Sequence, residues 1–223
     1  DKAISIYEEL NKERFSVAYY IPYFGSLLKT EQYKQAEKLA KKVVKIYPNS
    51  LSYQVEVGIV QRKSGNAKKA DRTFKKIFEN LTGQKSQSIN LANTFIRYDM
   101  YGDALQVYVL SEKLNVKSHF GIQKAQLYAH LGKVDLMLVE YLNELKRSPK
   151  QKKLVFAKVQ LFLNNDGIKS VTNYQLVKKQ LLPFVREEQG RTEFSELLIW
   201  LFMQNAQYEM AFRQAKSLDK RTD

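Results

Sequence analysis

The sequence predicts an all-α protein built from antiparallel helix pairs stacked one after another. The chain of 223 residues has only 9 Gly and 4 Pro, few for a protein made of short strands and tight turns. Its composition, 44% hydrophobic and 27% charged, is that of a folded globular protein rather than a disordered one. Alanine recurs as Ala36, Ala70 and Ala104, a constant period of 34 residues. A fixed period of this size indicates stacked repeats.

Each period contains two stretches in which apolar residues have helical spacing. In the clearest one, residues 51–63 and 67–81 are the two expected helices, and Gly65 lies in the break between them. The second stretch carries an apolar stripe at i, i+4, i+7 and i+8, formed by Ala70, Phe74, Ile77 and Phe78. One repeat is therefore expected to be a helix, a short turn and a second helix.

The same period divides the chain into units. Residues 1–151 are expected to hold repeats of this helix–turn–helix kind, with boundaries at 1–16, about 17–50, 51–84, 85–117 and 118–151. Residues 152–191 fit no clean repeat and are predicted to form an irregular helical hairpin, and 192–223 to form a last repeat. Residues 1–16 correspond to the second helix of a partial repeat, so we interpret the chain as a fragment of a longer protein.

The pattern resembles the tetratricopeptide repeat (TPR), a 34-residue helix–turn–helix with small and aromatic residues at fixed places. The matching residues are Ala36, Pro48, Gly58, Gly65, Ala70, Phe74, Ala92, Phe95, Tyr101, Ala104, Tyr108, Ala125, Tyr128, Gly132, Tyr141 and Pro149. The resemblance implies a TPR-like α-α superhelix, a right-handed solenoid of antiparallel helix pairs. It also implies that first helices line a concave groove and that second helices lie mainly on the convex outside.

No chemistry of the usual kinds is visible in the sequence. The chain has no Cys, which excludes disulfides and thiolate sites, and it lacks the HExxH, GxSxG and GxxxxGK[ST] motifs. His119 and His130 are eleven residues apart on one expected helix, roughly 16 Å, too far to share a metal ion. We therefore predict no catalytic residue, no metal ligand and no cofactor, and expect a protein that is not an enzyme.

No apolar run is long enough to span a bilayer. The sequence therefore favours a soluble protein, of the cytoplasm or the periplasm, and does not decide between these compartments.

Groove candidates are the first-helix positions that packing does not require. They are Val55, Ile59, Arg62, Asn90, Asn93, Arg97, Gln123, Gln126 and His130. This mixture of apolar, amide and basic groups suits an extended or helical peptide, whose backbone the amides can bond. The leading hypothesis is a non-enzymatic protein–protein interaction scaffold that binds a peptide or partner protein. Some TPR proteins hold a peptide's terminal carboxylate with Lys and Asn where Val55 and Ile59 stand, so that mode is not supported.

The formal net charge of +14 leaves alternatives open. Residues 1–151 hold 25 basic and 15 acidic residues, and 152–223 hold 12 and 8, so the charge is spread along the chain. Part of it forms a basic stripe on expected second helices: Lys34, Lys38, Lys41, Lys45, Lys68, Arg72 and Lys75. The stripe is either a solvated outer face or a surface for an anionic partner. Because Lys predominates and the aromatic residues occupy packing positions, nucleic acid is disfavoured.

An anionic membrane surface stays open as a partner by electrostatics alone. A third hypothesis is that the repeats are the interaction arm of a longer enzyme.

Overall fold

The computed structural model describes residues 2–13, 16–164, 171–188 and 190–222, and these contain helices and turns but no strand. This confirms the all-α fold class. The chain forms two compact units, Asp1–Ser118 and His119–Asp223. The predicted segments 1–16, 152–191 and 192–223 each include positions outside the described residues.

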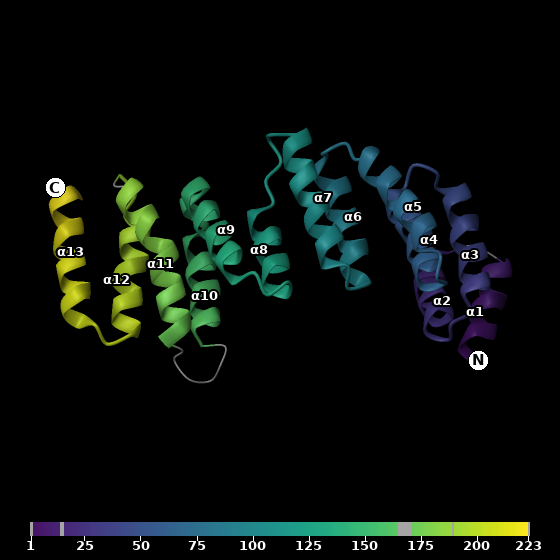
Figure 1. Ribbon diagram of the computed structural model, residues 1–223, viewed down its shortest axis with the longest axis horizontal. Helices are drawn as coiled ribbons and strands as arrows, with labels where there is room; N and C mark the ends of the chain where they lie inside the picture. The colour runs from purple at the N-terminus through teal and green to yellow at the C-terminus, as the bar shows by residue number, and fades with distance from the viewer. Residues whose placement is uncertain (1, 14–15, 165–170, 189, 223) are drawn as a thin grey trace. The chain divides into compact units, whose positions relative to one another are not determined.

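Helices follow one another along the chain in both units (Figure 1). The first unit contains α1 (Lys2–Glu13), α2 (Val17–Lys29), α3 (Tyr33–Ile46), α4 (Leu51–Lys63), α5 (Ala67–Glu79), α6 (Lys85–Arg97) and α7 (Tyr101–Leu114). The second contains α8 (Gly121–His130), α9 (Val134–Arg147), the 3₁₀ turn η1 (Pro149–Gln151), α10 (Lys152–Leu163), α11 (Val171–Glu187), α12 (Thr192–Gln204) and α13 (Tyr208–Thr222). Packing is most extensive within the pairs α4–α5, α6–α7, α8–α9 and α12–α13. The repeating unit is therefore the antiparallel helix pair of a TPR-like fold.

The alanines that set the period lie at the contacts between helices. Ala36 on α3, Ala70 on α5 and Ala104 on α7 are each 0% exposed. Helices pack about 8–10 Å apart, and the closest of these approaches need a small side chain at the contact. The 34-residue period in the sequence therefore corresponds to a close helix contact that recurs once in each repeat.

Gly58 makes room for an aromatic ring in the α4–α5 pair. A Cβ atom added at Gly58 would lie 2.5 Å from Cε1 of Phe74, which is closer than any real contact. The Phe74 ring is buried and its centroid lies 5.8 Å from that of Phe95 on α6. One glycine therefore allows Phe74 to connect two successive helix pairs.

In the helix pairs that begin with α2, α4, α6, α8 and α12, the turn after the first helix has one residue in the left-handed region. The residues with positive φ at these turns are Glu31 (59°), Gly65 (85°), Asp99 (58°), Gly132 (67°) and Ala206 (54°). After Gly65, for example, the Asn66 N–H donates to the Gln61 carbonyl at 2.8 Å. This is the bond that closes a Schellman motif at a helix C-terminus.

Ala206 carries a strained backbone that glycine would relieve. A left-handed conformation costs a residue with a Cβ about 1–2 kcal/mol, part of which the greater chain entropy of glycine offsets. We expect Ala206→Gly to raise the free energy of unfolding by roughly 1 kcal/mol, measured by urea unfolding followed by circular dichroism. Gly65→Ala is the matched control, because nothing lies within 4 Å of its added Cβ and only the backbone strain remains. Gly65→Ala should lower the free energy of unfolding by a similar amount. If Ala206→Gly also lowered it, the backbone of Ala206 would not be strained.

The second unit has its own apolar core, to which helices α8 to α13 contribute. Phe194, Leu197 and Leu201 on α12 are each 0% exposed. Helix α11 contacts α9 and α12 more extensively than it contacts α10, its neighbour in the chain. None of the described helices combines the length and apolarity needed to cross a membrane.

Candidate functional site

Two of the predicted groove residues belong to the core. Val55 is 0% exposed and Ile59 is 3% exposed. Helix α4 packs against α3, α5 and α6, so its apolar side chains are covered on more than one side. This corrects the expectation that Val55 and Ile59 line an accessible groove.

Arg62 on α4 is exposed, but its side chain contacts the neighbouring helix α5. Its guanidinium lies 4.7 Å from the centroid of the Phe74 ring and 3.3 Å from Oδ1 of Asp71, both on α5. With Asp103 of α7 it lines an open cavity of about 490 Å³. Arg62 therefore belongs to the surface of α5 and α7.

Three predicted residues form an accessible row on α6. Asn90, Asn93 and Arg97 are exposed, and their spacing of three and four places them on one face of the helix. We call these three residues the α6 row. In the second unit, on α8, Gln123 is partly buried while Gln126 and His130 are exposed. Partner binding by any of these residues stays a prediction.

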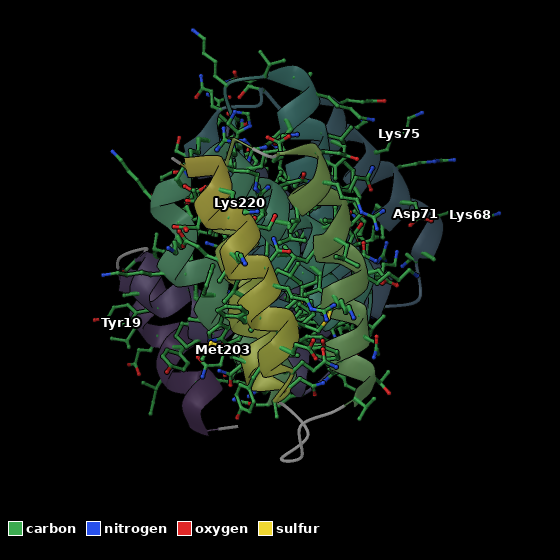
Figure 2. All side chains as sticks on the ribbon, turned by 90° about the vertical axis from the view of Figure 1, so that its left-hand side faces the viewer. Tyr19, Lys68, Asp71, Lys75, Met203 and Lys220 are labelled. Atoms are coloured by element: carbon green, nitrogen blue, oxygen red, sulfur yellow. The ribbon has the colours of Figure 1, made fainter. Side chains whose placement is uncertain are left out.

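The basic stripe is exposed at all seven positions, Lys34, Lys38, Lys41, Lys45, Lys68, Arg72 and Lys75. Figure 2 shows Lys68 and Lys75 extending outward from α5. Nζ of Lys41 lies 2.7 Å from Glu37, and Nζ of Lys75 lies 3.9 Å from Glu79, both one helical turn away. Such exposed pairs contribute about 0.3–0.5 kcal/mol, as on any solvated helix face.

A cavity of about 350 Å³ opens beside the α6 row, and we call it the three-helix cavity. It is lined by residues of α2, α4 and α6 and of the turn after α6: Ile21, Gly25, Leu28, Lys29, Lys63, Arg97, Tyr98 and Asp99. Arg97 is the one member of this lining that the sequence had indicated. Lys29 and Lys63 were missed, although they precede Arg97 at the same 34-residue period that identified the repeats.

A buried carboxylate lies behind this cavity. Glu56 on α4 is 1% exposed, and its Oε2 accepts a hydrogen bond from the Tyr20 hydroxyl at 2.5 Å. Its Oε1 accepts from the Tyr98 hydroxyl at 3.0 Å and from Nη1 of Arg97 at 3.4 Å. Tyr20 lies on α2 and Arg97 on α6, so one carboxylate joins three successive first helices.

The electrostatics of this cluster follow from its burial. Loss of hydration raises the pKa of Glu56, although the hydrogen bonds from Tyr20 and Tyr98 and the charge of Arg97 lower it. Burial and the neighbouring Glu56 raise the pKa values of Tyr20 and Tyr98 far above the ordinary phenol value. Both phenols therefore remain protonated and can donate to the carboxylate.

The Arg97 side chain contacts the buried cluster on one side and is open to solvent on the other. The Arg97 side chain is 43% exposed, while the Glu56 side chain it contacts is 2% exposed. The cluster was missed because Glu56 stands between Val55 and Val57, and a lone charge on a helix is ordinarily assigned to solvent. Among the described residues, no group of three or more His, Asp or Glu side chains is arranged to hold a metal ion.

Comparisons with known proteins give matches among solved structures alone. No protein-family model matches the sequence, and no curated protein matches it. The structure of MamA is 16% identical, with 76% of this chain and 93% of that chain covered and a TM-score of 0.37. YrrB, described as a TPR protein with an unusual peptide-binding site, is 14% identical, with 96% and 97% covered and a TM-score of 0.34.

A third match is the C-terminal part of a TPR repeat-containing protein from Cytophaga hutchinsonii. It is 14% identical, with 99% of this chain and 86% of that chain covered and a TM-score of 0.39. Similarity at these levels says nothing about what this chain binds.

Proposed function

We propose that this chain, which has the tetratricopeptide-repeat fold, is a non-enzymatic scaffold that binds a segment of a partner protein along its first helices. The observation that carries the proposal is the continuity of the α6 row with the three-helix cavity. Arg97 belongs to both, so the exposed row of α6 shares a residue with a cavity whose lining includes Ile21 and Leu28.

The chemistry of this surface suits a polypeptide. The side chains of Asn90 and Asn93 each offer donors and an acceptor, which can bond the backbone of an extended segment. Ile21 and Leu28 offer apolar contact inside the cavity. Ligand sites typically combine an apolar lining with a few polar groups placed in this way.

Removal of the two amides tests the proposal. Peptide binders would be selected from a random phage-displayed library on the full chain, and their affinities measured for the double variant Asn90→Ala, Asn93→Ala. Loss of two hydrogen bonds, each contributing about 0.5–1.5 kcal/mol, should weaken binding roughly tenfold or more without loss of helicity.

The matched control is Gln35→Ala with Gln106→Ala, which removes two exposed amides from the second helices α3 and α7. Its affinity should equal that of the wild type. If the control weakens binding as much as the α6 double variant does, the site is not on the first helices.

Binding of an anionic surface by the basic stripe is the second candidate. Lys41, Lys45 and Lys76 surround an open cavity of about 400 Å³ that also contains Val44 and Val57. Binding of RNA or anionic vesicles at this surface should weaken steeply with salt. The affinity for a peptide bound through amide and apolar contacts should change little with salt.

The third hypothesis is that this chain is the interaction arm of a longer enzyme. The catalytic residues would then lie outside the surfaces described above.

A further inference from the structure

Three first helices of the first unit end on a basic residue. Lys29 is the last residue of α2, Lys63 of α4 and Arg97 of α6, at intervals of 34 residues. A cation near a helix C-terminus gains about 0.3–1 kcal/mol from the helix dipole, and this accounts for a basic residue at each end. It does not account for the convergence of all three on one cavity with apolar residues in its lining.

We infer that the three-helix cavity binds an extended acidic peptide segment, whose carboxylates pair with Lys29, Lys63 and Arg97. This inference rests on the proposed function and names the chemistry of the partner. The site differs from a terminal-carboxylate clamp, since the basic residues are at the last position of each first helix.

The charge of the lining is complementary to such a segment. The lining has three cations and one carboxylate, that of Asp99, whose Oδ1 already accepts a hydrogen bond from the Tyr101 hydroxyl at 2.9 Å. Of the three cations, Arg97 also pairs with the buried Glu56, which is not part of the lining. Lys29 and Lys63 are exposed and form no ion pair with any residue in the described part of the chain. Two cations of the lining are thus available to an anionic partner.

Arg97 is held in place before a ligand arrives. One of its five N–H groups faces Oε1 of buried Glu56, at 3.4 Å, and 43% of the side chain is exposed. A side chain that is already ordered loses less entropy on binding. The buried cluster of Glu56 with Tyr20 and Tyr98 therefore acts as a positioning device for Arg97.

The shape of the lining favours a peptide. A Cβ added at Gly25 would meet nothing within 4 Å, so a chain can approach the α2 backbone there. Packed helices lie about 8–10 Å apart, and one three-residue turn of an extended polyproline II segment spans about 9 Å and brings the next side chain back to the same side. The expected ligand therefore has an acidic residue at about every third position, with apolar residues between them that contact Ile21 and Leu28.

Single-stranded nucleic acid fits this lining less well. Its recognition relies on aromatic rings that stack on bases. The aromatic residue of this lining is Tyr98, whose hydroxyl is bonded to Glu56. An acidic peptide is thus the ligand that the lining favours.

The test uses a fluorescent twelve-residue peptide with Glu at every third position and Leu and Ser between, and a second peptide with Gln replacing each Glu. Anisotropy titrations with the full chain should show the Glu peptide binding at least tenfold more tightly. Lys63→Glu converts attraction into repulsion and should weaken the Glu peptide about tenfold. The control Lys68→Glu makes the same charge change on α5, outside the cavity, and should alter affinity less than twofold.

Gly25→Trp provides a second variant that leaves the charge unchanged. Gly25 lines the cavity and a Cβ added there meets nothing within 4 Å, so we expect the Trp side chain to extend into the cavity. Binding of the Glu peptide should then be lost, while the midpoint of thermal unfolding should change little. Equal binding of the Glu and Gln peptides, or equal weakening by Lys63→Glu and Lys68→Glu, would overturn the inference. A twelve-nucleotide RNA that binds more tightly than the Glu peptide in a Lys63-dependent manner would also overturn it.

The outcomes separate this inference from the proposed function. If phage-selected peptides lose binding with Gly25→Trp but show no enrichment of acidic residues, the scaffold stands and the acidic ligand is wrong. If neither selected nor designed peptides respond to Gly25→Trp, both proposals fail.

Discussion

Replacement of Gly58 by valine is expected to lower the free energy of unfolding by about 2–3 kcal/mol, because it overfills a packed helix contact. A Cβ at this position would lie 2.5 Å from Cε1 and 2.8 Å from Cζ of Phe74. The ring cannot move away freely, since it is 3% exposed and packs against Phe95 on the next helix pair. The cost should therefore spread to the contact between α5 and α6.

Gly25→Val is the matched control for this substitution. Gly25 also lies inside a first helix, but an added Cβ meets nothing within 4 Å. Its effect should stay within about 0.5 kcal/mol, as for ordinary surface substitutions. Urea unfolding of both variants gives the comparison. Equal destabilisation would contradict the Phe74 contact as the cause of the loss, because valine has a higher helix propensity than glycine at both positions.

Removal of the Glu56 carboxylate is expected to cost about 3 kcal/mol. Glu56→Ala leaves the hydroxyls of Tyr20 and Tyr98 without their shared acceptor in a buried site, and such unsatisfied groups are expensive. Glu56→Gln should cost less, because the amide oxygen still accepts a hydrogen bond. Urea unfolding at pH 7 measures both losses, and a neutral Glu56→Ala would contradict a structural role for the cluster.

The Glu56→Gln variant also isolates the titration of Glu56. Burial raises the pKa of this carboxyl in the folded protein, so folding favours its protonated form. Its contribution to stability is therefore present below the unfolded pKa of about 4.3 and is lost as the pH rises through the folded value. The difference in unfolding free energy between wild type and Glu56→Gln should shift in favour of the Gln variant from pH 4 to pH 7. A Glu56→Gln difference that shifts towards the wild type with rising pH would contradict the effect of burial.

The periodicity of small residues was sufficient to predict the helix pairs. Ala36, Ala70 and Ala104 stand where two helices approach closely, and a larger side chain there would force them apart. The groove could be predicted only in part. Val55 and Ile59 share the apolar character of core positions, and α4 is covered on several sides by α3, α5 and α6. Sequence spacing does not distinguish an apolar groove residue from a core residue on such a helix.

The polar part of the site depended on contacts distant in the sequence. Glu56 is buried because Tyr20 and Tyr98, 36 and 42 residues away, supply the donors that make burial tolerable. No local pattern contains that information. Lys29, Lys63 and Arg97 could have been identified, because they follow the same period as the alanines, but charged residues are ordinarily assigned to solvent.

Amide chemical shifts of the ¹⁵N-labelled chain, titrated with a library-selected peptide, test the first-helix binding surface most directly. The account predicts shifts that cluster at the C-terminal half of α2 from Gly25 to Lys29, at Lys63, and from Asn90 to Asp99. Shifts confined to the basic stripe on α3 and α5, with these amides unchanged, would contradict it.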